Sequence, residues 1–177
     1  MDSEELIRQC KKHNRRAQEH IFKQYAPLMM ATCMRYLNHR ENSEECMLAG
    51  FQKFFEKIDQ FQFMGAASVT GYLKRIMINE CLMELRKNKP VFLTADTVLE
   101  PVLNEHSDGL ARLSAKEILL LLEKLPEGYR TIFNLYVIEN LSHREIAALL
   151  KISEGTSKSQ LSKARFLLQQ LIVAHER

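Results

Sequence analysis

The chain has 177 residues, of which 46% are hydrophobic, and a formal net charge of +3. This composition is ordinary for a globular protein and excludes wholesale disorder, and the length allows one domain or two small ones. No apolar run reaches the roughly 18 residues that a membrane-spanning helix needs, and the acidic N-terminal stretch has no signal-peptide core, so we expect a cytoplasmic protein without membrane insertion.

Helical periodicity dominates the first part of the chain, and no stretch alternates at the period of a β-strand. A short helix is expected over 4–12, capped by Ser3 and ended by the His-Asn pair at 13–14. A longer helix is expected over 15–37. Pro27 lies inside it and should kink or split it, because proline removes a backbone donor.

The next two helices are predicted from their flanking residues. An Asn-Ser pair at 42–43, followed by two glutamates, predicts a capped helix that runs to about Ile58. Residues 59–71 are rich in small and aromatic residues and are predicted to form a loop. A helix is expected over 72–87, and Pro90 should prevent its continuation.

Helical periodicity is lost over 91–112, which contains a proline and turns acidic, so this segment is the predicted linker. Helices resume where Ser114 and Glu117 have the spacing of a capping box. Pro126 is expected at the first position of the following helix, which Asn140 can end.

The sequence thus predicts an all-α fold of two helical bundles, 1–90 and 113–177, joined by a flexible acidic linker. The charge is unevenly distributed. Residues 72–89 carry five Lys or Arg against two Glu, and 142–177 carry six against three, whereas the linker carries four acidic residues against one Arg. Two basic segments around an acidic middle suit two contacts with a polyanion, and solvated helix surfaces are the alternative.

The four cysteines and six histidines are scattered along the chain, with no CxxC pair and no spacing typical of metal ligands. Such cysteines are typical of free thiols in a reducing compartment. We therefore expect buried or semi-buried thiols, and neither a metal nor a cofactor.

Residues 142–165 have the pattern of a helix-turn-helix. Ser142 and Glu145 form a second capping-box pair ahead of an apolar helix face. Lys151 stands at the turn, where a left-handed lysine would cost on the order of 1 kcal/mol. Ser153 can cap the second helix, whose first acidic residue, Glu154, complements the helix dipole.

The second helix has two distinct faces. At about 100° per residue, one stripe is apolar or small and is expected to be buried: Ser157, Leu161, Ala164, Leu168 and Leu171. The opposite face is small and cationic: Gly155, Lys158, Ser159, Ser162 and Lys163. A helix that enters the major groove of DNA needs small residues for close approach, and hydroxyls and cations for bases and phosphates. A helical hairpin with a solvated face is the alternative.

The stretch LPEGYRTIFNLYVIENLSHREIAALLKISEGTSKSQLSKARFLLQQL, residues 125–171, resembles the promoter-recognising C-terminal domain of bacterial RNA polymerase sigma factors, most of all the two-domain extracytoplasmic-function group. The N-terminal stretches FKQYAPLMMATCMRYLNHRENSEE, FFEKIDQF and GYLKRIMINECLMELRK resemble the same group in order and spacing. The resemblance implies a sigma subunit that binds core RNA polymerase and directs transcription initiation at −10 and −35 promoter elements. It also implies an anti-sigma factor as a regulatory partner.

The resemblance further implies a role for individual residues. The C-terminal bundle would contact the polymerase β flap and bind the −35 element through Thr156, Lys158, Ser159, Ser162, Lys163 and Arg165. The N-terminal bundle would melt and bind the −10 element through a loop and the helix beside it: Phe61, Phe63, Ser68, Lys74, Arg75, Asn79, Arg86 and Lys87. Aromatic pockets beside a cationic groove suit single-stranded bases. The β′ clamp would bind Glu45, Leu48, Ala49, Phe51 and Gln52.

The chain departs from the family pattern at a few positions. Leu48 and Ala49 stand where the family usually has Gln followed by Glu or Asp, and Val69 and Tyr72 replace an aromatic residue and Trp. Leu48, Ala49 and Val69 favour one alternative, a degenerate sigma-like module that binds an anti-sigma factor. A second alternative is a regulator that shares the helix-turn-helix and binds duplex DNA without polymerase. An enzyme is not expected, because the sequence has no P-loop, GxSxG or HExxH motif.

Overall fold

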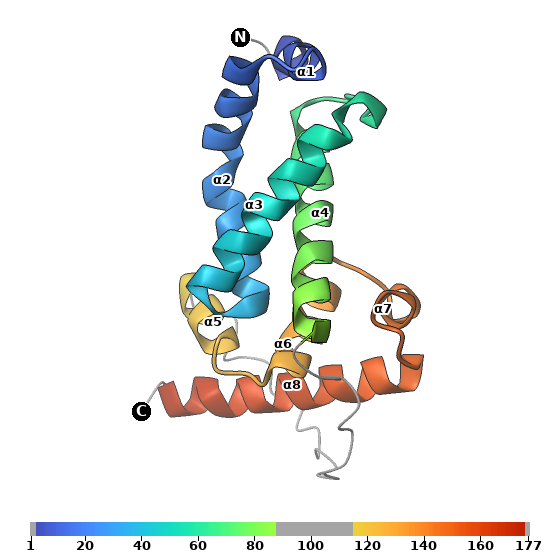
Figure 1. Ribbon diagram of the computed structural model, residues 1–177. Helices are drawn as coiled ribbons and strands as arrows, with labels where there is room; N and C mark the ends of the chain where they lie inside the picture. Colours follow the sequence, from blue (N-terminus) through green and yellow to red (C-terminus); the bar gives the residue numbers. More distant parts are fainter. Residues whose placement is uncertain (1–2, 88–114, 176–177) are drawn as a thin grey trace. The chain divides into compact units, whose positions relative to one another are not determined.

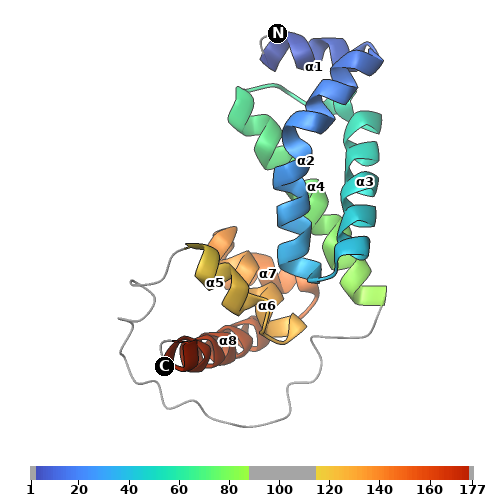
Figure 2. The same ribbon diagram turned by 90° about the vertical axis from the view of Figure 1, so that its left-hand side faces the viewer.

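The computed structural model describes residues 3–87 and 115–175, and these ranges contain helices and no strand (Figures 1 and 2). The chain divides into two compact units at Lys87. The all-α prediction with two helical bundles is confirmed. The predicted linker, 91–112, and the predicted cap at Ser114 lie outside the described residues.

The N-terminal unit contains α1 (Ser3–Lys11), α2 (Arg15–Leu37), α3 (Arg40–Glu56), the short 3₁₀ helix η1 (Ile58–Gln60) and α4 (Ala66–Lys87). Each of α2, α3 and α4 packs against the other two, and α1 lies against α2 and η1 (Figure 2). The core between the three long helices is made of fully buried side chains from all of them, including Met29, Cys33, Tyr36, Phe54, Leu73, Met77 and Cys81. The predicted bounds of α2 are those observed, and Asn14 caps it by accepting the N–H groups of Arg16 and Ala17.

Pro27 does not split α2, contrary to one of the two outcomes expected for it. The helix continues because its buried residues lie on both sides of the proline: Ala17, Ile21 and Tyr25 precede it, and Met29, Cys33 and Tyr36 follow it. Burial of these side chains against α3 and α4 offsets the loss of one backbone hydrogen bond.

The start of α3 lies earlier than the sequence predicted. Asn38 ends α2 in the left-handed conformation, with φ 50°, and His39 caps α3 at once. The His39 Nδ1 accepts the backbone N–H of Asn42 at 3.4 Å, and Ser43 is fully buried inside the first turn with its hydroxyl donating to the His39 carbonyl. The Asn-Ser pair is therefore helical and does not form the cap.

The start of α4 also lies earlier than predicted, at Ala66. Gly65 has φ 95°, and the Ser68 hydroxyl donates to the Gly65 carbonyl at 2.6 Å while accepting the Met64 N–H at 3.1 Å. Val69 is 1% exposed and begins a buried stripe that continues through Leu73. The second half of the predicted 59–71 loop is therefore helix, because this stripe can be buried only if the helix includes it.

The C-terminal unit contains α5 (Ala115–Leu122), α6 (Glu127–Phe133), the π-helical turn η2 (Asn134–Ile138), α7 (His143–Leu150) and α8 (Glu154–His175). The long α8 packs against α5, α6 and α7 (Figure 1). Pro126 is the N-cap of α6, one position before the predicted one. Asn140 adopts the left-handed conformation just after η2, as expected of a residue that ends a helix.

All four cysteines are free and buried, which confirms the expected state of the thiols. Burial raises the pKa of the Cys10 thiol to about 11. Within residues 3–87 and 115–175, no group of three or more His, Cys, Asp or Glu side chains could hold a metal ion. None of the helices described is long and apolar enough to cross a membrane.

Candidate nucleic-acid and polymerase interfaces

The entry to the helix-turn-helix is fixed by the predicted capping box. The Ser142 hydroxyl accepts the Glu145 backbone N–H at 3.3 Å, and the Glu145 carboxylate accepts the Ser142 N–H at 2.8 Å. The Ser142 hydroxyl also donates to this carboxylate at 2.7 Å, and this bond, together with the one from the Ser142 N–H, lowers the pKa of Glu145. Two otherwise unpaired donors at the start of α7 are thereby satisfied.

The turn between α7 and α8 is tight. Lys151 is left-handed, with φ 57° and ψ 46°, as predicted, and the N–H of Ile152 donates to the Ala147 carbonyl at 3.1 Å. The Ser153 hydroxyl accepts the Thr156 N–H at 2.9 Å and so caps α8, also as predicted. The cost of the lysine, on the order of 1 kcal/mol, is offset by these bonds.

The two faces of α8 are separated as the periodicity predicted. Ser157, Leu161, Ala164 and Leu168 are buried, and Leu171 is half-buried. On the outer face Gly155, Lys158 and Ser159 are exposed, as is Arg165, whereas Thr156, Ser162 and Lys163 are half-buried. The first turns of α8 therefore present hydroxyls and cations to solvent above an apolar base.

One contact beneath the outer face is not evident from periodicity. The Nδ1 of His143, the first residue of α7, lies 2.9 Å from the hydroxyl of Ser157, which is fully buried in α8. Burial lowers the pKa of His143, and the charges of Lys158 and Arg165 lower it further. This hydrogen bond therefore joins the start of α7 to the buried side of α8.

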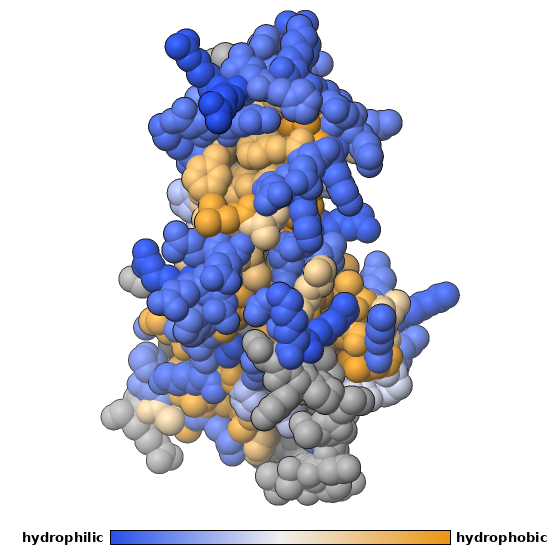
Figure 3. Space-filling model, viewed as in Figure 1, coloured by the Kyte–Doolittle hydropathy of each residue, from blue (hydrophilic) through white to orange (hydrophobic). Residues whose placement is uncertain are grey.

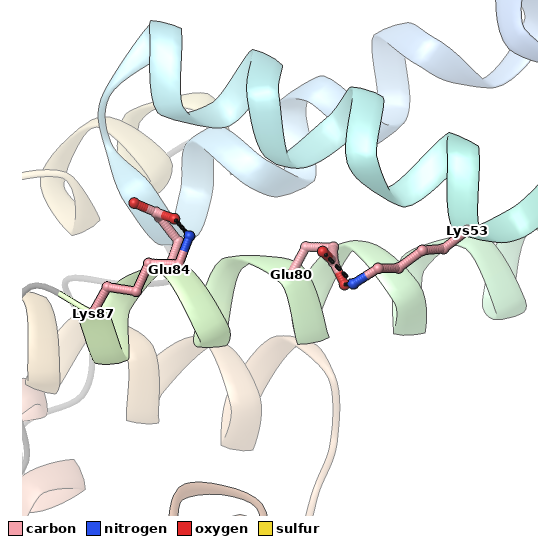
Figure 4. Close-up of polar contacts among 4 residues, drawn as sticks. All are labelled: Lys53, Glu80, Glu84 and Lys87. Carbon is pink, nitrogen blue, oxygen red and sulfur yellow. Dashed lines mark hydrogen bonds and ion pairs between the residues drawn. The ribbon is translucent and has the colours of Figure 1, made fainter.

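The cations of α4 are on or near the surface of the N-terminal unit. Arg75, Asn79, Arg86 and Lys87 are exposed, and Lys74 is half-buried. The two glutamates of this helix are paired with lysines: Glu80 accepts from Lys53 of α3 at 2.7 and 2.8 Å, and Glu84 pairs with Lys87 at 2.9 Å (Figure 4). Within the described ranges, Lys74 and Arg75 have no ion-pair partner, so their charge is available to an anionic ligand.

The loop before α4 is held at both ends. The Nζ of Lys11 donates to the carbonyl of Phe61 at 2.7 Å, and Ser68 binds the other end as described above. Phe61 is buried and stacks on Tyr72, with ring centroids 5.0 Å apart. Phe63 is half-buried, whereas the side chain of Met64 is 80% exposed.

The outer face of α3 is partly apolar. Leu48 is 49% exposed, Ala49 is half-buried, and Glu45 and Gln52 are exposed. Phe51 is buried against Phe22 of α2, with ring centroids 4.8 Å apart. Figure 3 shows apolar surface between α2 and α3 within a largely hydrophilic unit.

Comparison with known proteins decides the family. Residues 21–91 match Sigma-70 region 2, and residues 115–167 match Sigma-70, region 4. The chain is 30% identical over 176 residues to the ECF RNA polymerase sigma factor SigW of Bacillus subtilis strain 168, with 93% of each chain covered. The chain belongs to the extracytoplasmic-function (ECF) sigma factors.

Two further similarities agree with this assignment. The RNA polymerase sigma-H factor of Pseudomonas aeruginosa is 21% identical over 92% of this chain and 89% of its own. The sigma factor RpoE of Bartonella quintana, solved in complex with the anti-sigma factor NepR, has a TM-score of 0.51 at 21% identity and covers 90% of this chain and 98% of its own. This second likeness shows the ECF sigma fold.

This ECF sigma factor is a promoter-recognising subunit that binds core RNA polymerase and promoter DNA, and its family consists of non-enzymatic initiation factors. Both sigma regions are matched, in family order, and nothing favours the regulator or the degenerate module. The departures from the family pattern at Leu48, Ala49, Val69 and Tyr72 are therefore substitutions within a sigma factor.

The structure separates the ECF sigma factor's predicted site residues into surface and core. Phe51 is 2% exposed and Phe61 is 6% exposed, so both pack beneath the surfaces assigned to them. Helical spacing alone does not indicate this, because each is buried by aromatic rings of other segments. The Ser68 hydroxyl is hydrogen-bonded to the backbone of its own loop, at Met64 and Gly65. Helical periodicity also gave no sign of His143, whose contact with Ser157 joins α7 to α8.

Proposed function

We propose that this ECF sigma factor divides promoter recognition between its two bundles. Residues 1–90 bind core polymerase and open the −10 element, residues 113–177 bind the −35 element, and the 91–112 segment links them. The protein acts in the cytoplasm by binding, and not by catalysis. The observation that carries the proposal is the face of α8 that presents hydroxyls and cations to solvent. The turn before this helix is fixed on one side by the end of α7 and on the other by the Ser153 cap.

For the −35 element, α8 enters the major groove with its N-terminal turns. Lys158 and Ser159 reach base edges, and the half-buried Thr156, Ser162 and Lys163 line the contact. The buried stripe of α8 supports this proposal, because it leaves the small polar face as the side that DNA can approach. Arg165 contacts a phosphate farther along the helix.

For the −10 element, the single strand lies along α4. The unpaired charges of Lys74 and Arg75 attract its phosphates, and Asn79, Arg86 and Lys87 extend the surface. Phe63 contacts a base, while Phe61 and Ser68 hold the loop in shape. Pairing of both α4 glutamates with lysines supports the proposal, since it lowers the negative charge that DNA would meet.

For core polymerase, the β′ clamp binds the outer face of α3 through Glu45, Leu48, Ala49 and Gln52, above the buried Phe51, and the C-terminal unit binds the β flap. The exposure of Leu48 supports this, because a half-exposed leucine gains from burial at an interface. Bartonella quintana RpoE was solved with an anti-sigma factor. We propose that an anti-sigma factor of similar kind also holds this chain.

The test is run-off transcription with core polymerase on a library of randomised −35 and −10 sequences. We expect transcription by the holoenzyme to enrich particular promoter sequences from the library, whereas core enzyme alone should enrich none. On the enriched promoter, Lys158→Ala should weaken −35 binding by about 1–3 kcal/mol. Lys124→Ala, at an exposed lysine in the turn after α5, should not. A footprint unchanged by Lys158→Ala would contradict the −35 assignment, and binding of duplex DNA without core polymerase would instead favour a regulator.

A further inference from the structure

Four side chains of the C-terminal unit form a connected set that begins in the core and ends on the DNA-facing side of α8. The fully buried Ser157 hydroxyl lies 2.9 Å from the Nδ1 of His143. The His143 ring stacks on Tyr136 of η2, with centroids 4.5 Å apart and planes at 25°. The guanidinium carbon of Arg165 lies 5.7 Å from the centre of the Tyr136 ring. We call this set the Tyr136 stack.

The Tyr136 stack passes from buried to exposed. Ser157 is 0% exposed, Tyr136 and His143 are half-buried, and Arg165 is exposed. A long cationic side chain on a helix surface ordinarily samples many rotamers, and ordering it on binding costs conformational entropy. A ring placed under the guanidinium by cation–π attraction restricts that freedom before DNA arrives.

Tyr136 lies inside the π-helical turn η2. The N–H of Glu139 donates to the Asn134 carbonyl at 3.0 Å, a bond that spans five residues instead of four. Single π-helical turns of this kind are frequent at functional sites. His143 then braces the ring from the first turn of α7.

Arg165 has a defined place relative to the residues proposed to contact bases. It follows Lys158 by seven residues, which is close to two helical turns, so both lie on the same side of α8 about 10 Å apart along the axis. A recognition helix contacts base edges with its N-terminal turns, and the major groove is about 12 Å wide. A residue 10 Å farther along is therefore suited to the phosphates at the groove edge.

We propose that Tyr136 is a positioning residue that holds the Arg165 guanidinium ready for a backbone phosphate of the −35 duplex, with His143 bracing the ring. The planar guanidinium can bind a phosphate through two parallel N–H groups. This inference rests on the proposed role of α8 in −35 binding. It goes further by assigning a function to two residues that do not themselves contact DNA.

The test measures the affinity of holoenzyme for the enriched promoter over a series of salt concentrations, with four variants: Arg165→Gln, Tyr136→Leu, Tyr136→Phe, and the double variant Tyr136→Leu with Arg165→Gln. Loss of one phosphate contact lowers the salt slope by about 1, so we expect this for Arg165→Gln. Tyr136→Leu should weaken binding about two- to fivefold and move the slope toward that of Arg165→Gln. The double variant should be no weaker than Arg165→Gln alone, and Tyr136→Phe should restore what Tyr136→Leu loses.

Three results would overturn the inference while leaving the −35 assignment intact: Tyr136→Leu without effect, losses that multiply in the double variant, or failure of Tyr136→Phe to restore affinity. If Arg165→Gln changes neither the promoter affinity nor its salt slope, Arg165 does not contact DNA as proposed. Should Tyr136→Leu unfold the C-terminal unit, nuclear Overhauser contacts between the Arg165 side chain and the Tyr136 ring in the wild-type full chain decide the matter. Their presence is expected, and their absence contradicts the positioning role.

Discussion

The ammonium group of Lys11 donates a hydrogen bond to the backbone carbonyl of Phe61, 2.7 Å away, and thereby ties the first helix to the loop before α4. The same ammonium lies 3.4 Å from the carbonyl of Asp59. One cation at the end of α1 thus holds two carbonyls of the segment that we place at the −10 strand.

Replacing Lys11 by methionine should loosen this loop without affecting the −35 unit. A hydrogen bond to a charged group contributes about 1.5–3 kcal/mol, and partial exposure of Lys11 places the expected loss of stability near the lower value. Open-complex formation, measured by permanganate reactivity of −10 thymines, should fall, whereas −35 footprinting should not change. Lys12→Met, at the exposed neighbour, is the matched control. Equal effects of the two substitutions would contradict a specific role for Lys11.

Leu48→Asp should weaken the complex with core polymerase by about 1–2 kcal/mol, or roughly tenfold. The side chain is 49% exposed, so the melting temperature of the free chain should stay nearly unchanged. Co-elution with core polymerase measures the first effect, and thermal unfolding the second. Met83→Asp is the control, because Met83 of α4 is 47% exposed and lies outside the proposed clamp surface. Loss of binding by Met83→Asp to the same degree would argue against a specific contact at Leu48.

The Gly155→Ala substitution should change the stability of the protein and its promoter affinity in opposite directions. A Cβ added at Gly155 meets only the Ser153 hydroxyl, at 3.6 Å, which is an ordinary contact. Because alanine favours a helix over glycine, stability should rise by up to about 1 kcal/mol. If the α8 backbone approaches DNA closely here, promoter affinity should fall although the protein is more stable. Urea unfolding and promoter affinity in holoenzyme give the two values, and unchanged or tighter promoter binding would show that DNA does not approach Gly155.

The stability of the C-terminal unit should depend on His143 at mildly acidic pH. Burial and the charges of Lys158 and Arg165 lower the pKa of His143 in the folded state below its usual 6.5. Between these two pKa values the unfolded chain binds more protons than the folded chain, so stability falls as pH decreases through 6.5 toward the lowered value. Unfolding titrations at pH 7.5 and 5.5 should show a larger loss for wild type than for His143→Gln. An identical loss in both proteins would rule out this contribution.

Helix ends marked by the usual capping residues could be predicted from the sequence, and others could not. Ser142 and Ser153 cap the helices expected of them, whereas Ser3, the expected cap of the first helix, lies inside α1. Histidine is an uncommon capping residue, so the sequence predicted the Asn-Ser pair at 42–43 as the cap of α3 instead of His39. The small and aromatic residues of 59–71 suggested a loop, yet the buried stripe that starts at Val69 belongs to a helix that begins at Ala66.

In the candidate site, too, some features could be predicted from the sequence and others could not. The outer face of α8 follows from local periodicity, and the structure has the expected residues there. Burial of Phe51 and Phe61 depends on aromatic rings from other segments, and the contact of Tyr136 with His143 and Arg165 joins three elements. Such tertiary contacts have no period along the chain, so the sequence pattern did not reveal them.

Burial of all four thiols has a practical consequence. Toward a water-soluble maleimide the folded chain should behave as though it had no cysteine, because the reagent cannot reach a buried thiol. A cysteine introduced at one exposed position in each unit would therefore accept a fluorophore selectively, without removal of any native residue. Energy transfer between the two dyes would then follow the separation of the units while a polymerase is bound, a promoter is opened and the subunit is released.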